Sequence, residues 1–519
     1  MRSVLRTISL LLLVTAAASA QVTEQTTVEV IQVPVYVTSG GAPISNLTRD
    51  NFRLFVNGKP QSIDYFDVID FEHLSPEDAR DPRQRRLYLM VFDVSFSSAN
   101  SLQRAQKAAE KIIELARDGD TFGIAAMAPG HGVEVVVPFS RDRIALVRAI
   151  RNLQPSRMRD PLRLALTPSE REGIASGTMV GGSMVGTLAN AEESAMRDFD
   201  SNIVREAVEN AIGDLADTAV RLAPLEGIKH VVLLSAGFDP SLVHGVPSQR
   251  NPYSMRRSTD SERSRNLGFD PALLGAIRRM HDTFKTSGVF LDAIDIGGLR
   301  MMQRVSDNEA LYMLTRDTGG EVVDKRNDLA GAMQYLVNLQ RVAYVLAFNA
   351  PKTGRALNTI AVKLQNVPRG AHTSYRESYA SETDPPDAGD PLRLADIVMN
   401  DIPQTGVTMS AAAESDPGKA TVELEIAGGE LVAQAAGMTL EGELLFYVFA
   451  GSGAVAFDRQ QITIEPRAAA ALASTPLRVR HTFDLPPGRY VAKALIRFGF
   501  NQSLGFARTE EFTVPTASP

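Results

Sequence analysis

Between residues 87 and 342, short apolar runs alternate with segments of helical periodicity, and this alternation restricts the fold more than any other feature of the chain. Residues 87–92 form a continuous apolar run, which a strand needs when both of its faces are buried. Residues 101–116 then repeat their apolar side chains with the period of an amphipathic helix. Strands that alternate with such helices predict an α/β domain over residues 85–342, with a doubly wound, mostly parallel sheet. Further strands are predicted at 121–127, 133–139, 230–234 and 289–296, and further helices at 144–153, 203–222, 272–286, 308–317 and 329–342.

Strand-like segments rich in β-branched residues lie on both sides of this region. Residues 28–37 are one example, and Asn57 with Gly58 is a dipeptide suited to a tight hairpin, because both residues tolerate positive φ. We therefore predict an N-terminal β module at 21–80 and a β extension at 343–382.

The last part of the chain has a different composition. Residues 383–395 are rich in Pro, Asp and Gly, which is typical of a linker. Residues 396–519 contain several short alternating segments between turn residues and no convincing helix. This pattern predicts a β-sandwich of roughly immunoglobulin size.

The first twenty residues have the order of an export signal. Arg2 and Arg6 precede an apolar run at 8–14, and small residues follow up to Ala20, after which we expect cleavage. The apolar run is too short to span a bilayer, and no transmembrane segment is expected in the mature chain. Because the chain has no Cys, a lipid anchor at the cleavage site is excluded, and the predicted location is secreted or periplasmic.

Composition and motifs argue against several classes of function. A formal net charge of -7 disfavours nucleic acid as a partner, and the absence of Cys excludes thiolate metal sites and cysteine nucleophiles. The seven His do not form a zinc-binding motif, and Ser235 lacks the G-x-S-x-G elbow of a hydrolase. Asp292 and Asp295 are predicted to lie on opposite faces of a strand, so they do not make an acid–base pair. We predict that the protein is not an enzyme.

Polar residues with metal-binding chemistry directly follow the first buried strand. Asp93, Ser95 and Ser97 form a D-x-S-x-S pattern just before a predicted helix, and ligands bind at the carboxyl ends of strands in such sheets. A carboxylate and two hydroxyls are hard oxygen ligands suited to Mg²⁺. The alternative is that the three residues only cap the helix and order the loop, since Asp and Ser are favoured at helix N-termini.

In this strand-to-helix context the chain resembles a von Willebrand factor type A domain, whose metal-ion-dependent adhesion site begins with D-x-S-x-S. The resemblance covers residues 87–342. Together with the preceding β module and the segments 314–321 and 344–348, it is similar to an exported family related to von Willebrand A proteins that is common in Acidobacteria.

The resemblance implies further metal ligands, and the sequence departs from the family pattern at one of them. The family's fourth strand ends in T-D-G or S-D-G, whose Asp completes the coordination, whereas here Ala236 stands at that position. Asp239 is a candidate substitute for the missing carboxylate. A loop Thr ligand should lie within the insertion 154–195, where the candidates are Thr178, Ser183 and Thr187.

Two functions remain open from the sequence. The first is an exported, non-enzymatic protein-binding or adhesion module that uses the top of the α/β sheet, with or without Mg²⁺ at Asp93, Ser95, Ser97 and Asp239. The second is a metal-free structural or assembly protein of the cell envelope, which Ala236 favours. Basic side chains in a second long segment, 239–270, are expected to be solvated loop charge.

Overall fold

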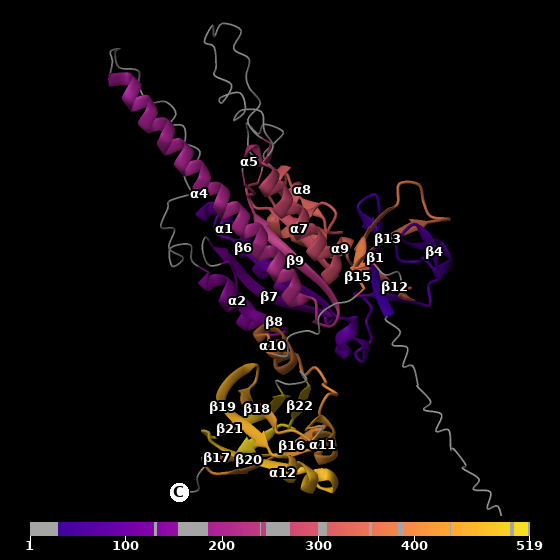
Figure 1. The fold of residues 1–519 in the computed structure, drawn as a ribbon, viewed down its shortest axis with the longest axis vertical. Helices are drawn as coiled ribbons and strands as arrows, with labels where there is room; N and C mark the ends of the chain where they lie inside the picture. The colour runs from indigo at the N-terminus through magenta and orange to yellow at the C-terminus, as the bar shows by residue number, and fades with distance from the viewer. Residues whose placement is uncertain are drawn as a thin grey trace, which may run out of the picture.

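The protein forms an α/β domain and two β domains, one to the right of the α/β domain and one below it in Figure 1. No helix within the described part of the chain is long and apolar enough to cross a membrane. The predicted export signal lies outside the described residues. The computed structural model describes residues 30–128, 132–153, 185–238, 240–244, 270–298, 309–351, 355–381, 389–435, 437–498 and 503–516.

The α/β domain is built on a six-stranded sheet with the order β11-β10-β9-β6-β7-β8. All neighbouring strands are parallel except β8, which runs antiparallel to β7 at the edge. Every residue of β6, β7 and β10 is buried, which explains why apolar residues predominate in these strands. The strands are β6 (Arg86–Asp93), β7 (Asp120–Ala128), β8 (Gly132–Ser140), β9 (Ile228–Ser235), β10 (Val289–Asp295) and β11 (Val322–Val323).

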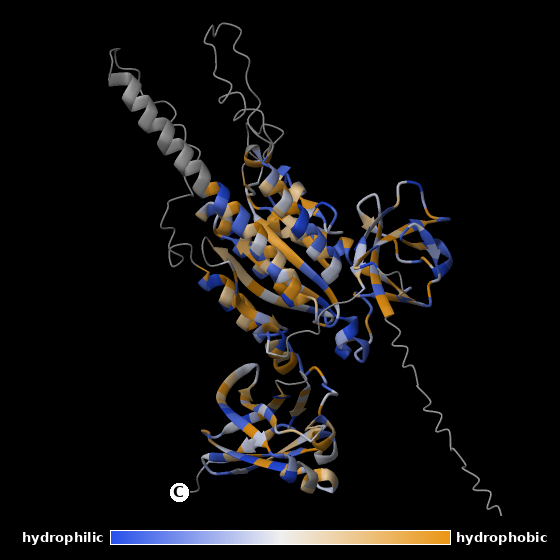
Figure 2. Ribbon diagram, viewed as in Figure 1, coloured by the Kyte–Doolittle hydropathy of each residue, from blue (hydrophilic) through white to orange (hydrophobic). Residues whose placement is uncertain are grey.

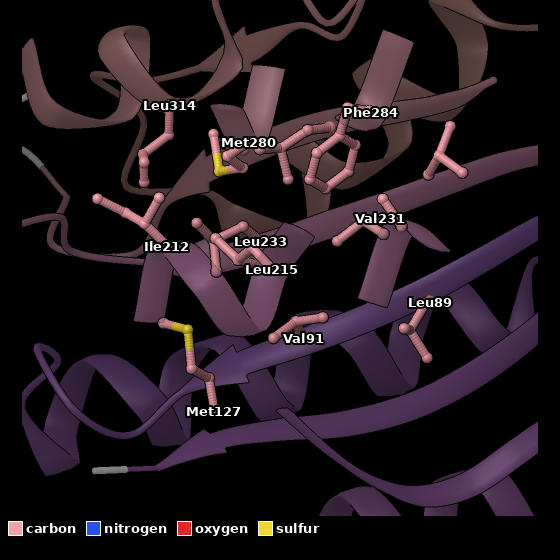
Figure 3. Packing of buried hydrophobic residues seen from close by; sticks show 14 of the residues in the cluster. Leu89, Val91, Met127, Ile212, Leu215, Val231, Leu233, Met280, Phe284 and Leu314 are labelled. Carbon is pink, nitrogen blue, oxygen red and sulfur yellow. The ribbon is translucent and has the colours of Figure 1, made fainter. Parts of the chain in front are cut away.

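Helices cover both faces of this sheet and bury a separate apolar core on each. Side chains such as Leu89, Val91 and Leu233 point to one face, where they pack against α4, α7 and α8 (Figure 3). The intervening residues of the same strands pack on the other face against α1, α2 and α9. The α/β class predicted from the sequence is therefore confirmed. The helices are α1 (Ala99–Glu114), α2 (Arg143–Asn152), α4 (Val185–Leu222), α5 (Ser241–His244), α7 (Pro271–Ser287), α8 (Glu309–Thr315) and α9 (Leu329–Leu339).

Helix α4 is longer than its periodicity predicts. The sequence indicates a helix from residue 203 and a surface insertion at 154–195, but α4 begins at Val185. Residues 185–195 of the predicted insertion are thus helical. Small and polar residues dominate this first part, so it gives no apolar stripe from which a helix could be recognised.

One β domain contains strands from both sides of the α/β domain. The sequence predicts two separate segments, 21–80 and 343–382, whereas the structure pairs β1 with β12 and β3 with β13. The two sheets, β14-β1-β12-β5 and β15-β13-β3-β4, enclose one apolar core. The strands are β1 (Val30–Ser39), β2 (Ala42–Pro43), β3 (Phe52–Val56), β4 (Lys59–Gln61), β5 (Tyr65–Asp70), β12 (Val342–Asn349), β13 (Leu357–Leu364), β14 (His372–Tyr375) and β15 (Ser378–Ala380).

The hairpin predicted at Asn57 and Gly58 is present in this domain. The two residues join β3 to β4 with φ values of 50° and 75°, which are the left-handed values that such a turn requires.

The C-terminal domain has two antiparallel sheets, β16-β17-β20 and β19-β18-β21-β22, around a shared core. Alternation of hydrophobic and hydrophilic residues along its strands is visible in Figure 2. Contrary to the sequence prediction, it also contains helices. Helix α10 starts inside the predicted linker 383–395, and α11 begins with two Gly, which are poor helix formers and gave no helical signal. The elements are α10 (Pro391–Asn400), β16 (Met409–Asp416), β17 (Lys419–Ile426), α11 (Gly428–Ala435), β18 (Leu440–Ala450), β19 (Gly453–Ile464), α12 (Pro466–Ala471), β20 (Leu477–Asp484), β21 (Gly488–Phe498), β22 (Leu504–Arg508) and β23 (Phe512–Val514).

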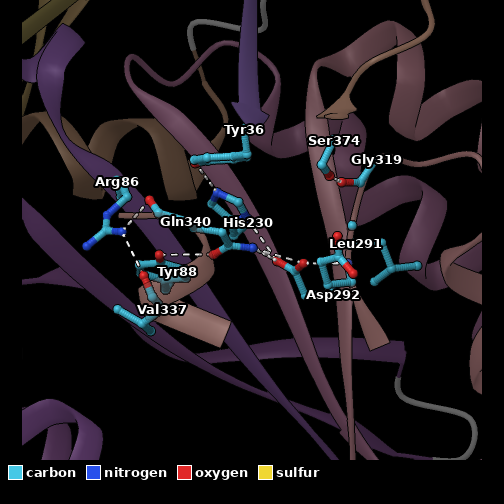
Figure 4. Close-up of polar contacts among 12 residues, drawn as sticks. Tyr36, Arg86, Tyr88, His230, Leu291, Asp292, Gly319, Val337, Gln340 and Ser374 are labelled. Atoms are coloured by element: carbon cyan, nitrogen blue, oxygen red, sulfur yellow. Dashed lines mark hydrogen bonds and ion pairs between the residues drawn. The ribbon is translucent and has the colours of Figure 1, made fainter. Parts of the chain in front are cut away.

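Buried polar contacts join the N-terminal β domain to the sheet of the α/β domain (Figure 4). The hydroxyl of Tyr36 on β1 lies 2.8 Å from Nε2 of His230, whose Nδ1 lies 2.8 Å from Asp292 Oδ2. The Gln340 amide donates to both oxygens of Asp292 at 3.0 Å and accepts from the Tyr88 hydroxyl at 3.1 Å. Because the ring of His230 is fully buried, this network fixes one orientation of the two domains.

A second buried contact joins the α/β domain to α10. The guanidinium of Arg85 forms a two-pronged ion pair with Asp396, with Nη1–Oδ1 at 2.9 Å and Nη2–Oδ2 at 2.6 Å. The side chains are only 1% and 3% exposed. Separating the two buried charges would leave each of them without a partner, which is strongly unfavourable. The ion pair therefore holds α10 against the start of β6.

Candidate functional site

Three neighbouring strands end in polar residues at one edge of the sheet. Asp93 ends β6, Ser235 ends β9 and Asp295 ends β10. In the strand register, Phe92 pairs with Leu234 and Asp295 pairs with Ser235, so these ends lie side by side. The carboxyl-end location predicted for Asp93 is the one observed.

The carboxylate of Asp93 is completely buried and surrounded by hydrogen-bond donors. Its Oδ1 accepts from the backbone N–H of Ser95 at 2.8 Å and of Phe96 at 3.0 Å. Its Oδ2 accepts from the hydroxyls of Ser235 and Ser97, the latter at 3.5 Å. The structure therefore brings together all three residues of the D-x-S-x-S pattern and adds Ser235 from the neighbouring strand.

The two motif hydroxyls tie this loop to the adjacent strands. Ser97 Oγ accepts from the backbone N–H of Ala236 at 3.1 Å, which connects the loop to the end of β9. Ser95 Oγ donates to the carbonyl of Met127 at 3.2 Å, which connects it to β7. Both serines are 7% exposed, so the cluster lies just beneath the surface of the edge.

The N-cap of helix α1 is a different residue, Ser98. Its hydroxyl accepts from the backbone N–H of Ser101 at 3.2 Å. The alternative prediction, that Asp93, Ser95 and Ser97 cap the helix, is therefore wrong in its capping part. The same prediction also has these residues order the loop, and this agrees with the structure, because Asp93 binds two backbone amides of the loop.

No basic side chain among the described residues lies within ion-pair distance of Asp93. Burial raises the pKa of this carboxyl, while the hydrogen bonds from Ser235, Phe96, Ser95 and Ser97 act in the opposite direction. The hydrogen bonds thus offset part of the cost of burying the anionic form, which has no compensating charge beside it in the described part of the chain.

Several of the predicted ligands lie beyond the described residues. These are Asp239, Thr178 and Ser183. Thr187 falls within α4, of which only the backbone is described at that position.

Ser235 and Asp295 belong to this edge as well, although the sequence motif does not include them. A signal for both is their position, since each lies within one residue of the carboxyl end of a predicted buried strand. Asp295 Oδ1 accepts from the backbone N–H of Gly297 at 2.8 Å, and its side chain is 1% exposed. Asp292, in contrast, belongs to the buried network around His230, so the two acids do not share a site, as predicted.

The described residues fit Mg²⁺ only in part. The Ser95 hydroxyl gives its proton to a carbonyl and keeps lone pairs for a ligand, and Asp93 supplies a buried negative charge. However, the position of the second family carboxylate holds the methyl group of Ala236, whose backbone N–H is bound to Ser97. The D-x-S-x-S cluster itself therefore offers a single carboxylate, Asp93, together with neutral hydroxyls.

With this geometry in place, comparison with known families identifies the domain. Residues 88–172 match the family model of the von Willebrand factor type A domain, which supports a domain of this type within the α/β region. The matched range includes the D-x-S-x-S loop and ends before Ser235. A comparison with curated proteins gives no match.

Solved structures of similar fold have low identity to this chain. An aerotolerance-related membrane protein from Bacteroides fragilis is 12% identical over 49% of this chain and 98% of its own, with a TM-score of 0.25. The type V pili tip protein Mfa5 from Porphyromonas gingivalis is 11% identical over 77% and 75%, with a TM-score of 0.28. Proximal thread matrix protein 1 from the mussel byssus, with zinc in its adhesion motif, is 12% identical over 50% and 48%, with a TM-score of 0.25.

Proposed function

We propose that this chain is an exported, non-enzymatic protein-binding module whose docking surface is the carboxyl edge of the α/β sheet around Asp93. The observation that carries the proposal is the buried Asp93 cluster, which connects the loop after β6 to the ends of β7 and β9. This arrangement holds the loop in one conformation at the edge where von Willebrand A-type sheets present ligands. A preformed loop favours binding because less conformational entropy is lost.

The proposal does not make partner binding depend on Mg²⁺. Asp93, Ser95 and Ser97 are the described residues that would contact the ion, and a bound ion would supply an open coordination position for a partner carboxylate. Because Ala236 removes one carboxylate, we assign the cluster mainly the role of shaping the docking edge.

Site-specific photo-crosslinking tests the docking surface. A photoreactive amino acid replaces Val94, which follows Asp93 directly, or Phe457, an exposed residue of β19, in the full chain expressed in its native envelope. We expect a discrete crosslinked protein from position 94 that is lost when Asp93→Ala is added. Capture only from position 457, or capture from 94 that Asp93→Ala leaves unchanged, would argue against the proposal.

Calorimetric titration with Mg²⁺ or Mn²⁺ tests the metal part separately. We expect binding no tighter than the millimolar range. Asp93→Asn keeps the shape of the side chain but removes its charge, and Asp416→Asn in the C-terminal domain is the matched control. Micromolar binding that is lost in Asp93→Asn and in Asp239→Asn, but retained in the control, would show a functional metal site.

A metal-free structural or assembly role is the second candidate, and Ala236 favours it. In that case the docking surface belongs to the C-terminal domain, whose edge strand β19 exposes Val455 and Phe457 at 54% and 55%. The same crosslinking experiment distinguishes the two, since this role predicts capture from position 457 independently of Asp93.

A further inference from the structure

An open cavity of about 310 Å³ lies at the end of the sheet opposite to Asp93. It is bounded by the start of β7 at Asp120, the end of β8 at Ser140 and the first turn of α2. The segment that follows α1, residues 116–118, and the short helix η2 (Asp78–Arg80) complete its wall. Parallel strands start at this edge, so the cavity is separate from the proposed docking surface.

Four arginines from different elements line this cavity: Arg80, Arg117, Arg141 and Arg143. Two acids, Asp118 and Asp120, line it as well. The charge of Asp120 is already compensated, because its Oδ1 accepts from Arg86 Nε at 2.9 Å and Nη2 at 2.6 Å. The lining therefore carries an excess of positive charge.

Neutral carbonyl groups hold two of these guanidiniums in place. Arg141 donates to the carbonyl of Ala79 at 2.8 Å. Arg143 donates to the carbonyls of Glu114 at 3.1 Å and Ala116 at 2.6 Å. Among the described residues, neither arginine has a carboxylate within ion-pair distance. Their positions are thus fixed while their charges remain uncompensated.

One nitrogen of the Arg117 guanidinium has no hydrogen-bond acceptor among the described residues. Its Nη1 is buried and makes no hydrogen bond within the described part of the chain, and Nη2 reaches Glu72 only at 4.0 Å. The side chain as a whole is 27% exposed and lines the cavity, so its guanidinium can turn toward a small ligand there. A buried N–H without an acceptor costs free energy that a bound anion would recover.

We propose that this arginine-lined cavity binds the phosphate group of a small soluble molecule. A carboxylate is satisfied by one guanidinium fork, whereas a phosphate presents three oxygens that guanidiniums from several directions can bind together. The volume is at the lower end of the range for small-molecule sites and leaves room beside the phosphate for the rest of an ester.

Titration of the full chain with inorganic phosphate and with glycerol 1-phosphate, at constant ionic strength, tests this site. We expect saturable binding with one site per chain and tighter binding of the ester. Arg141→Gln and Arg117→Gln should each weaken binding at least tenfold. Arg316→Gln, at an arginine that directly follows α8 and is 79% exposed, should change it less than twofold. Thermal unfolding without phosphate checks that each variant is folded.

Two results would overturn the site. One is the absence of saturable binding of either compound at constant ionic strength. The other is an equal loss in Arg316→Gln, which would show a general effect of net charge. Arg141 is an exposed side chain, so Arg141→Gln remains a valid test even where Arg117→Gln reduces folding. Equal affinity for the two compounds would show that the site contacts only the phosphate group. It would then contradict the inference that the cavity also accommodates the rest of an ester.

Discussion

Buried acids in this protein differ in whether a positive charge lies beside them. Asp120 has the guanidinium of Arg86 at hydrogen-bond distance, with the two side chains 1% and 0% exposed. Asp93, which is also buried, and Glu321, which is half-buried, have no basic partner among the described residues. Burial is the largest cause that raises the pKa of each of them, and for Glu321 the nearby Asp292 adds to it. Such acids make the stability of the sheet depend on pH.

Glu321 gives the clearest pH dependence because its pKa is raised to about 7. A raised pKa means that folding favours the protonated acid, so its stabilising effect is present below the normal pKa near 4.5 and is lost as the pH rises through 7. We expect the free energy of unfolding to fall by about 1–3 kcal/mol between pH 5 and pH 8 on account of this group. Urea unfolding at both pH values measures it.

Glu321→Gln should remove this dependence, because the amide is neutral throughout. The control is Glu510→Gln at an exposed position of the C-terminal domain, which should leave the pH dependence as it is. A wild-type slope that Glu321→Gln does not reduce would show that other groups determine it.

The sequence alone predicts some of the residues of the candidate site. Asp93, Ser95 and Ser97 follow a strong strand signal within five positions, and local spacing alone brings them together. Ser235 is 142 positions away from Asp93, and only the order of strands in the sheet makes them neighbours. A sequence pattern cannot give that order, so Ser235 was not recognised.

Among the elements, the turn between α8 and β11 depends on one glycine in particular. A Cβ on Gly320 would lie 2.0 Å from the carbonyl oxygen of Leu291 in β10. Since that oxygen belongs to a central strand, it cannot move without disturbing the sheet. We expect Gly320→Ala to destabilise the protein by about 2 kcal/mol or more, measured by urea unfolding.

Gly213 in α4 provides a control of opposite sign. Nothing lies within 4 Å of the position of its Cβ, and it is exposed within a helix. Gly213→Ala should therefore stabilise the protein by about 0.5–1 kcal/mol, because alanine loses less entropy in a helix. Similar effects of the two substitutions would contradict the steric argument.

The sequence predicts strands well when both of their faces are buried. Strands that are largely exposed are harder to predict. Strand β6 has eight consecutive buried residues, which an apolar run signals directly. Strand β16 buries none of its residues fully and consists largely of Ala, Ser and acids, which have little β preference. Its position depends on pairing with β17, which local sequence does not encode.

For the whole molecule, pairing between distant segments determines the domain structure. Strand β1 pairs with β12, so Val30 lies opposite Asn349, and the complete α/β sheet is inserted between the two strands. The sequence indicates that both segments are strands, but either could pair locally. The buried contact between Tyr36 and His230 then fixes the inserted domain against the β domain.

At the other end of the α/β domain, the Arg85–Asp396 pair should determine whether the C-terminal domain unfolds together with it. Asp396→Ala leaves the buried guanidinium with the carbonyl of Glu226 at 3.2 Å as its remaining partner. Loss of one member of a buried ion pair costs about 3–5 kcal/mol. We expect calorimetry to show one main transition for the wild type and two separate transitions for Asp396→Ala, with the α/β domain unfolding first.

The double substitution Arg85→Met with Asp396→Leu separates the effect of lost charge pairing from the effect of lost contact. Apolar side chains of similar volume restore packing between α10 and the start of β6 without a buried charge, and such replacements are often neutral or stabilising. The double variant should therefore recover a single transition near the wild-type temperature, while Asp416→Ala on exposed β16 should behave as the wild type does. Two transitions in the double variant would mean that the coupling depends on the ion pair itself and not on the packing of α10.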